Sequence, residues 1–105
     1  MENKTYELRY LPLFEQDLLK AVSYITNVLK NPQAADKLLD DVEQAILERL
    51  NNPVAFEPYR SAKKRPYHYY RIYVRNYVVY YVVIDNIMEV RRFLYGARDM
   101  DKLLY

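Results

Sequence analysis

The side chains that could do chemistry gather in one basic stretch of the sequence. Residues 58–84 contain six Lys or Arg residues and no Asp or Glu, although the formal net charge of the whole chain is only +2. Such a stretch attracts phosphates or an acidic protein, unless it is ordinary solvated surface. We expect four of these residues to contact nucleic-acid phosphates. They are Lys63, Lys64, Arg65 and Arg75.

Tyrosines alternate with arginines at the end of this stretch. Arg71 and Arg75 fall on the same face of an expected strand as Tyr69 and Tyr73. An arginine can hold a phosphate while a tyrosine stacks on a base, so this face is a candidate nucleic-acid surface. The alternative is that the same side chains only cover the sheet. Either Arg91 or Arg92 joins this face, depending on the register of the last strand.

The chain has one His, one Gly and no Cys. His68, close to the basic run, is a possible acid or base because imidazole titrates near neutral pH, although packing is the alternative. The missing cysteines exclude a disulfide scaffold, a thiolate metal site and a thiol nucleophile, and a single glycine excludes a Gly-rich phosphate loop. We therefore expect no metal and no cofactor.

No segment is expected to insert into a membrane. The first five residues are not followed by the apolar run of a signal peptide. The longest almost apolar stretch, residues 77–84, is far too short to cross a bilayer. We expect a cytoplasmic protein of one domain over residues 1–105.

Two amphipathic helices are expected in the first half of the chain. Apolar residues recur at helical spacing over residues 13–30 and again after Asn31-Pro32, up to the sequence Asn-Asn-Pro at residues 51–53. Asn31 is a good N-cap and Pro32 suits the first helical turn. The short connection predicts an antiparallel helix hairpin.

Strands are expected around the helices. Residues 6–11 alternate as a short strand, and residues 67–74, 77–84 and 87–95 form a meander. Arg75-Asn76 and Asp85-Asn86 suit tight turns, since Asn tolerates positive φ. Gly96 ends the last strand, and a short helix is expected over residues 99–104. The fold class is α+β, an antiparallel sheet of order β-α-α-β-β-β covered on one face by the helix hairpin.

This order, with the basic run before the second strand, resembles the RelE/ParE superfamily of type II toxins. The segment YRI-x4-YVVYYVV over residues 70–83 and the close R-x3-GARD-x3-LL over residues 92–104 carry the resemblance. The resemblance implies a toxin that an antitoxin neutralises. RelE-like members cleave mRNA in the ribosomal A site, whereas ParE-like members block DNA gyrase without catalysis.

The RelE pattern implies a set of five catalytic positions. Arg71 falls on the first of two lysines and Arg98 matches the arginine after the last strand, so these two are the candidate catalytic residues. Tyr73 and Val78 fall on two further cationic positions, and Leu104 falls on a tyrosine. Two of the five positions keep their chemistry.

The resemblance implies inhibition of cell growth, and three alternatives stay open. The first expectation is ribosome-dependent mRNA cleavage, with the ribosome and mRNA as partners. The second is a ParE-like, non-catalytic inhibitor of DNA gyrase, and the third is a degenerate homologue that only binds an antitoxin. In each case the expected partner is a cognate antitoxin whose tail folds on the toxin and covers part of the basic strand face.

Overall fold

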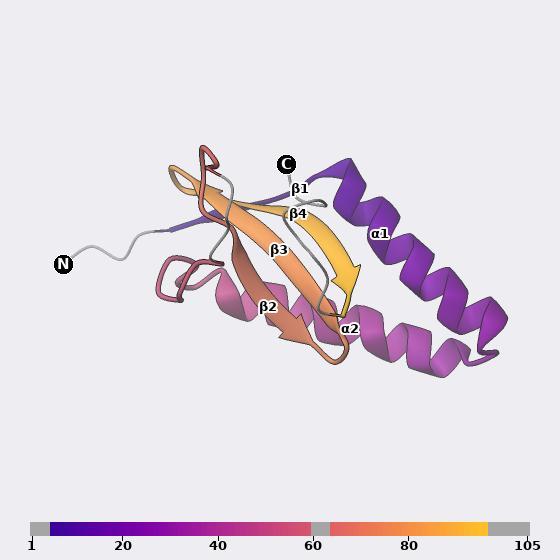
Figure 1. Cartoon of the computed structure of the whole chain (residues 1–105). Coiled ribbons are helices and arrows are strands. Elements are labelled where there is room, and N and C mark those ends of the chain that lie inside the picture. Colours follow the sequence, from indigo (N-terminus) through magenta and orange to yellow (C-terminus); the bar gives the residue numbers. More distant parts are fainter. Residues whose placement is uncertain (1–4, 60–63, 97–105) are drawn as a thin grey trace.

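The computed structural model describes residues 5–59 and 64–96 (Figure 1). Along the chain lie β1 (Glu7–Tyr10), α1 (Pro12–Ser23), η1 (Tyr24–Val28), α2 (Pro32–Arg49), β2 (Tyr70–Val74), β3 (Tyr77–Ile84) and β4 (Ile87–Tyr95). The expected order of elements and the α+β class are confirmed. The helix expected over residues 99–104 lies outside the described residues.

The helix hairpin forms where the sequence predicts it. Asn31 caps α2, since its side-chain oxygen accepts a hydrogen bond from the Ala34 amide at 3.1 Å. The first helix differs from the expectation of one regular helix, because after Ser23 it widens into the π-helical turn η1. Apolar spacing does not reveal such an extra residue in a turn. Lys30, with φ of 56°, then turns the chain into α2.

The four strands form a mixed sheet in the order β1-β4-β3-β2. The pairs β2–β3 and β3–β4 are antiparallel as expected, but β1 pairs with β4 in parallel. Topology explains this difference. The helix α2 returns the chain to the end of the sheet where β1 starts, so β2 runs in the same direction as β1 (Figure 1). Two hairpins then reverse the chain twice, and β4 therefore also runs parallel to β1.

The strand ends agree closely with the sequence prediction. β3 and β4 have the expected bounds, whereas β2 starts at Tyr70, three residues later than expected. In the turn between β2 and β3 it is Arg75, and not Asn76, that adopts a positive φ, of 56°. Gly96 ends β4 with φ of 72°, a conformation that glycine adopts without strain.

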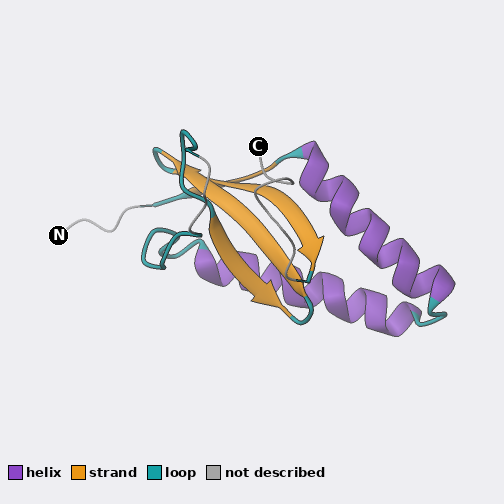
Figure 2. Ribbon diagram, in the orientation of Figure 1, coloured by secondary structure: helices purple, strands orange, loops and turns teal. Residues whose placement is uncertain are grey.

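Both helices cover the same face of the sheet (Figure 2). The main core lies between the helices and the sheet and contains Phe14, Leu38, Val42, Ile46, Ile72, Val79, Tyr81, Met88, Val90 and Phe93. A second, smaller cluster lies on the opposite face and contains Tyr69, Val78, Tyr80, Val82 and Leu94. The strand β3 is therefore buried on both sides, as its continuous apolar sequence predicts. None of the helices in the described ranges is both long and apolar enough to cross a bilayer.

Candidate functional site

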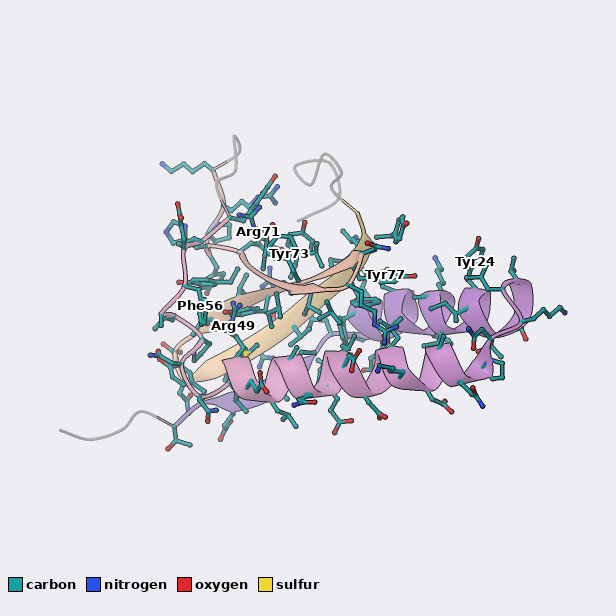
Figure 3. The ribbon with its side chains drawn as sticks, turned by 90° about the horizontal axis from the view of Figure 1, so that it is seen from below. Tyr24, Arg49, Phe56, Arg71, Tyr73 and Tyr77 are labelled. Carbon is teal, nitrogen blue, oxygen red and sulfur yellow. The ribbon has the colours of Figure 1, made fainter. Side chains whose placement is uncertain are left out.

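The sheet face that points away from the helices carries a pocket of about 330 Å³, called the open-face pocket below. Its lining combines tyrosines and arginines with small and apolar residues from the ends of β2, β3 and β4. The lining residues are Tyr59, Arg71, Tyr73, Arg75, Asn76, Tyr77, Val78, Tyr80, Tyr95 and Gly96. Figure 3 shows Arg71 and Tyr73 on this side of the sheet, away from the helices.

Arg71 lies between two tyrosine rings. Its guanidinium carbon is 5.1 Å from the centre of the Tyr59 ring and 5.8 Å from that of Tyr73. In the part of the chain that the structure describes, no carboxylate pairs with this guanidinium. A planar cation flanked by aromatic rings can receive a carboxylate or a phosphate from a partner.

The backbone of Arg71 is held by Arg49, a residue that sequence reasoning missed. Nη1 of Arg49 donates to the Arg71 carbonyl oxygen at 3.1 Å and to the Tyr81 hydroxyl at 2.9 Å. The same guanidinium lies 3.5 Å from the centre of the Phe56 ring. Arg49 ends α2, where a cation also interacts favourably with the helix dipole. Its place in the last helical turn is the signal that the sequence offers.

The tyrosine hydroxyl of Tyr80 stays protonated at physiological pH. Burial raises the pKa of Tyr80 to about 12, although the nearby charge of Arg71 lowers it. A group with this pKa is a poor general base near neutral pH. Tyr80 therefore contributes surface and a hydroxyl to the open-face pocket.

Arg75 lies in the turn after β2, and its side chain reaches α2. Its Nη2 is 2.9 Å from Oδ2 of Asp41, and each of the two side chains is 38% exposed. The sequence predicts Arg75 on the face of Arg71, but the left-handed backbone of the turn directs its guanidinium to the helix. It still lines the open-face pocket.

Apart from Arg71 and Arg75, the predicted site residues that the structure describes do not line the open-face pocket. His68 is exposed in the segment before β2 and does not line the open-face pocket. Lys64 is exposed as well, and the guanidinium of Arg65 lies 5.5 Å from the centre of the Tyr69 ring. Lys63 and Arg98 lie outside the described residues, so the pairing of Arg98 with Arg71 stays a prediction from the sequence.

Val78 lines the open-face pocket and is only 5% exposed. It pairs with Tyr73 across β2 and β3. These two positions are those at which the RelE pattern implies cations. The structure thus places an apolar and an aromatic side chain there, directly beside Arg71.

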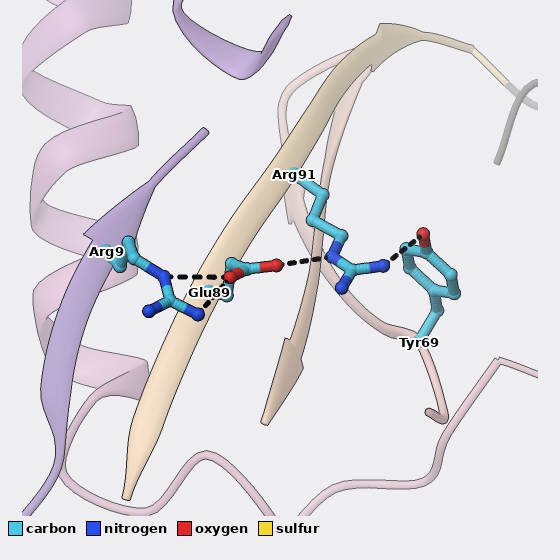
Figure 4. Close-up of polar contacts among 4 residues, drawn as sticks. All are labelled: Arg9, Tyr69, Glu89 and Arg91. Carbon is cyan, nitrogen blue, oxygen red and sulfur yellow. Dashed lines mark hydrogen bonds and ion pairs between the residues drawn. The ribbon is translucent and has the colours of Figure 1, made fainter. Parts of the chain in front are cut away.

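A buried carboxylate organises the far end of the same face (Figure 4). Glu89, 5% exposed, accepts from Nε of Arg9 at 2.8 Å and from Nε of Arg91 at 2.7 Å. Burial alone would raise the pKa of Glu89, but the hydrogen bonds and charges of Arg91 and Arg9 hold it below its ordinary value. Arg91 also donates to the Tyr69 hydroxyl at 3.1 Å.

An irregularity in the pairing of β3 with β4 decides which of Arg91 and Arg92 lies on the open face of the sheet. The register shifts between Tyr80 and Tyr81, which pair with Arg92 and Val90. Arg91 faces Tyr69 on the open side, whereas Arg92 donates from Nε to Asp17 of α1 at 2.7 Å. Alternation along the strand could not predict this, because a bulge changes which residues share a face.

A larger groove of about 820 Å³, called the hairpin groove below, lies between the helix hairpin and the ends of the strands. The helices contribute Asp17, Lys20, Ala21, Tyr24, Ile25, Leu29 and Leu38. The strands contribute Arg75, Asn76, Tyr77, Arg92, Phe93, Leu94 and Tyr95. Burial raises the pKa of Tyr77, and the charges of Tyr95 and Tyr24 raise it further.

Ligands for a metal ion do not gather anywhere in residues 5–59 and 64–96, where no group of three or more His, Asp or Glu residues could hold one. The open-face pocket and the hairpin groove are instead lined by arginines, tyrosines and apolar side chains. This chemistry suits recognition of a partner surface.

Solved structures with the same fold come from toxin–antitoxin modules. A chain of the chromosomal ParDE system of P. aeruginosa superposes with a TM-score of 0.68 at 14% identity, over 91% of this chain and all (100%) of that one. A chain of the E. coli DinJ–YafQ complex gives 0.59 at 13% identity, over 96% of this chain and 100% of that one. YafQ from E. coli superposes with a TM-score of 0.54 at 12% identity, over 87% of this chain and 93% of that one.

The sequence itself identifies the family. No curated protein matches the chain significantly. Residues 8–100, however, match the family model of the ParE toxin of the type II toxin–antitoxin system parDE. This match covers nearly the whole chain and confirms the resemblance to the RelE/ParE superfamily. The chain belongs to the family of ParE toxins of type II toxin–antitoxin systems.

Proposed function

We propose that this toxin stops growth by binding DNA gyrase and inhibiting it, without cutting RNA. The family makes the chain a toxin with an antitoxin as its partner, and its structural neighbours include toxin–antitoxin complexes. The family does not by itself define the target. The composition of the open-face pocket carries our choice.

The open-face pocket holds more side chains that suit a protein interface than side chains that could act as a base or stabilise a phosphate in RNA cleavage. Tyrosine and arginine dominate the energetics of protein–protein interfaces, and both types line the pocket. Cleavage of RNA by a 2′-OH needs a base and cations on the phosphate. Val78 and Tyr73 stand beside Arg71 where such cations would be required, and Tyr80 keeps its proton. These features favour a binding toxin over a nuclease.

Ribosome-dependent mRNA cleavage is the second candidate. One observation favours it: Arg71 is flanked by Tyr59 and Tyr73, an arrangement that suits a phosphate and its stacked base. In this case Arg71 would hold the scissile phosphate. Arg98 would be the second catalytic residue, and Lys63, Lys64 and Arg65 would contact ribosomal RNA.

Two assays on the same purified toxin separate the candidates. The first measures supercoiling of relaxed plasmid by gyrase, and the second maps the ends of a defined mRNA in a reconstituted translation reaction. We expect loss of supercoiling and an intact mRNA. Cuts at A-site codons that require ribosomes, together with normal supercoiling, would replace gyrase inhibition by the nuclease mechanism.

Replacing Arg71 tests whether the open-face pocket contacts gyrase. Arg71→Ala should weaken inhibition of supercoiling about 30-fold, as expected for a central interface arginine worth about 2 kcal/mol. Inhibition by Arg71→Lys should be weaker than that by the wild type and stronger than that by Arg71→Ala. Lysine keeps the charge but loses the planar group that stacks on the tyrosines. The measurement is the toxin concentration that halves supercoiling.

Lys37→Ala serves as the matched control. It removes one exposed cation from α2 that lines neither pocket, and it should leave inhibition unchanged. Thermal unfolding of all variants checks that they are folded. Equal inhibition by Arg71→Ala and Lys37→Ala would show that gyrase is not bound through the open-face pocket.

A further inference from the structure

The open-face pocket and the hairpin groove share one wall. Four residues line both: Arg75, Asn76, Tyr77 and Tyr95. Tyr77 and Tyr95 pair across β3 and β4, and their rings contact edge to face with centres 5.2 Å apart. The Gly96 amide donates to the Asn76 carbonyl at 2.7 Å, which ties the turn to the end of β4. A change in the wall on one side therefore changes the surface on the other.

Arg75 is the charged residue of this wall, and its position depends on one ion pair. Nε and Nη2 of Arg75 donate to the same carboxylate oxygen of Asp41, at 3.2 and 2.9 Å. Asp41 lines neither pocket. Because both side chains are half-exposed, a partner carboxylate can compete with Asp41 for the guanidinium.

The lining of the hairpin groove indicates what kind of segment would fill it. Ala21, Ile25 and Phe93 contribute apolar surface, and the charged lining residues are Lys20, Arg75, Arg92 and Asp17. Three of the four are cations, and Asp17 is already paired with Arg92. An amphipathic segment that carries a carboxylate complements this surface. The partner that the family provides is the antitoxin.

We infer that Arg75 couples the two pockets: an acidic, amphipathic segment of the antitoxin binds in the hairpin groove, draws Arg75 away from Asp41 and thereby reshapes the open-face pocket. In this arrangement the antitoxin leaves the open-face pocket uncovered, in contrast to the covering of the basic strand face that the sequence suggests. This inference rests on the proposed function only in treating the open-face pocket as the gyrase-binding surface. The reshaped open-face pocket binds its target more weakly. Since linkage is reciprocal, a target bound in that pocket weakens antitoxin binding by the same factor.

Nuclear magnetic resonance of ¹⁵N-labelled toxin with unlabelled, purified antitoxin tests the coupling. Cross-saturation identifies the toxin amides that touch the antitoxin, and chemical shifts identify those whose surroundings change. We expect cross-saturation at Ala21 and Leu38, which line only the groove, and shift changes without cross-saturation at Val78 and Tyr80. Direct saturation of Val78 and Tyr80 would overturn the inference, as would their unchanged shifts.

A pair of adjacent substitutions isolates the role of Asp41. Asp41→Asn releases Arg75 and should tighten antitoxin binding about two- to fivefold, the range that a half-exposed ion pair allows. Asp40→Asn removes the same charge one residue away, from a side chain that lines neither pocket, and should leave the affinity unchanged. Equal effects of the two variants would mean that general charge, and not Arg75, sets the affinity.

The outcomes separate this inference from the proposed function. Neither the resonance experiment nor the affinity series contains gyrase, so both can succeed when supercoiling is not inhibited. Conversely, gyrase inhibition that depends on Arg71, with no shift changes at Val78 and Tyr80, would keep the proposed function and remove the coupling.

Discussion

Tyr80 lines the open-face pocket with only 3% of its surface exposed. Its raised pKa, of about 12, means that the folded chain holds this proton more tightly than the unfolded chain, where tyrosine titrates near 10. The resulting stabilisation is complete below pH 10 and is lost as the pH rises through 12. Loss of the proton of this one pocket side chain thus lowers the stability of the fold at alkaline pH.

Tyr80→Phe should flatten this alkaline loss. We expect the free energy of unfolding of the variant to fall less than that of the wild type between pH 10 and 12, by about 1 kcal/mol. Tyr67→Phe, at a side chain that is 40% exposed, is the control and should follow the wild type. Urea unfolding at a series of pH values measures the difference, and parallel curves for Tyr80→Phe and the wild type would contradict the expectation.

At the scale of the element, α2 depends on its first residues. Asn31 satisfies the Ala34 amide, and Pro32 occupies the first turn, where no amide donor is needed. Asn31→Ala should lower the free energy of unfolding by about 1 kcal/mol, the usual value of an N-cap. Gln33→Ala, at the neighbouring exposed position, should change stability by less than about 0.5 kcal/mol in a urea titration.

Local signals of this kind made most elements predictable. Asn31-Pro32 predicted the start of α2, and the β-branched and aromatic run predicted β3 with its bounds. Each of these signals acts between residues that are close in sequence. The hairpins that join β2, β3 and β4 are equally local, so their antiparallel pairing followed from the turns.

The features that were not predicted depend on residues far apart. Arg75 pairs with Asp41, 34 positions away, and Arg92 pairs with Asp17, 75 positions away. Each of these arginines also depended on local backbone geometry, a left-handed turn in one case and a bulge in the other. The sequence therefore predicted the shared strand face of Arg71 and Tyr73, whereas the contacts of Arg75 and those of Arg49 required the structure.

At the scale of the whole molecule, Glu89 connects three separate parts of the chain. Through Arg9 it reaches β1, and through Arg91 it reaches Tyr69 in the segment before β2. Glu89→Gln should destabilise the fold by about 1–3 kcal/mol at pH 7, because two arginines lose the charge they share. Glu7→Gln on β1, an exposed position, is the matched control with little expected effect.

The same carboxylate sets the response of the molecule to acid. The pKa of Glu89 is lowered on folding, so its stabilising contribution is present above the ordinary glutamate pKa of 4.5 and is lost as the pH falls below it. Thermal unfolding from pH 7 to pH 3 should therefore show a steeper acid loss in the wild type than in Glu89→Gln. Equal slopes would mean that other carboxylates govern the acid limit.

The parallel pairing of β1 with β4 also has a consequence for how the protein is made. Among the described strands, β1 pairs only with β4, so residues 7–10 find these partners only when residues 87–90 have been synthesised. A nascent chain on the ribosome therefore cannot complete this sheet before residues 87–90 have been made, since pairing so distant in sequence forms late. The strand order thus makes the pairing of the earliest described strand wait for synthesis of the latest one.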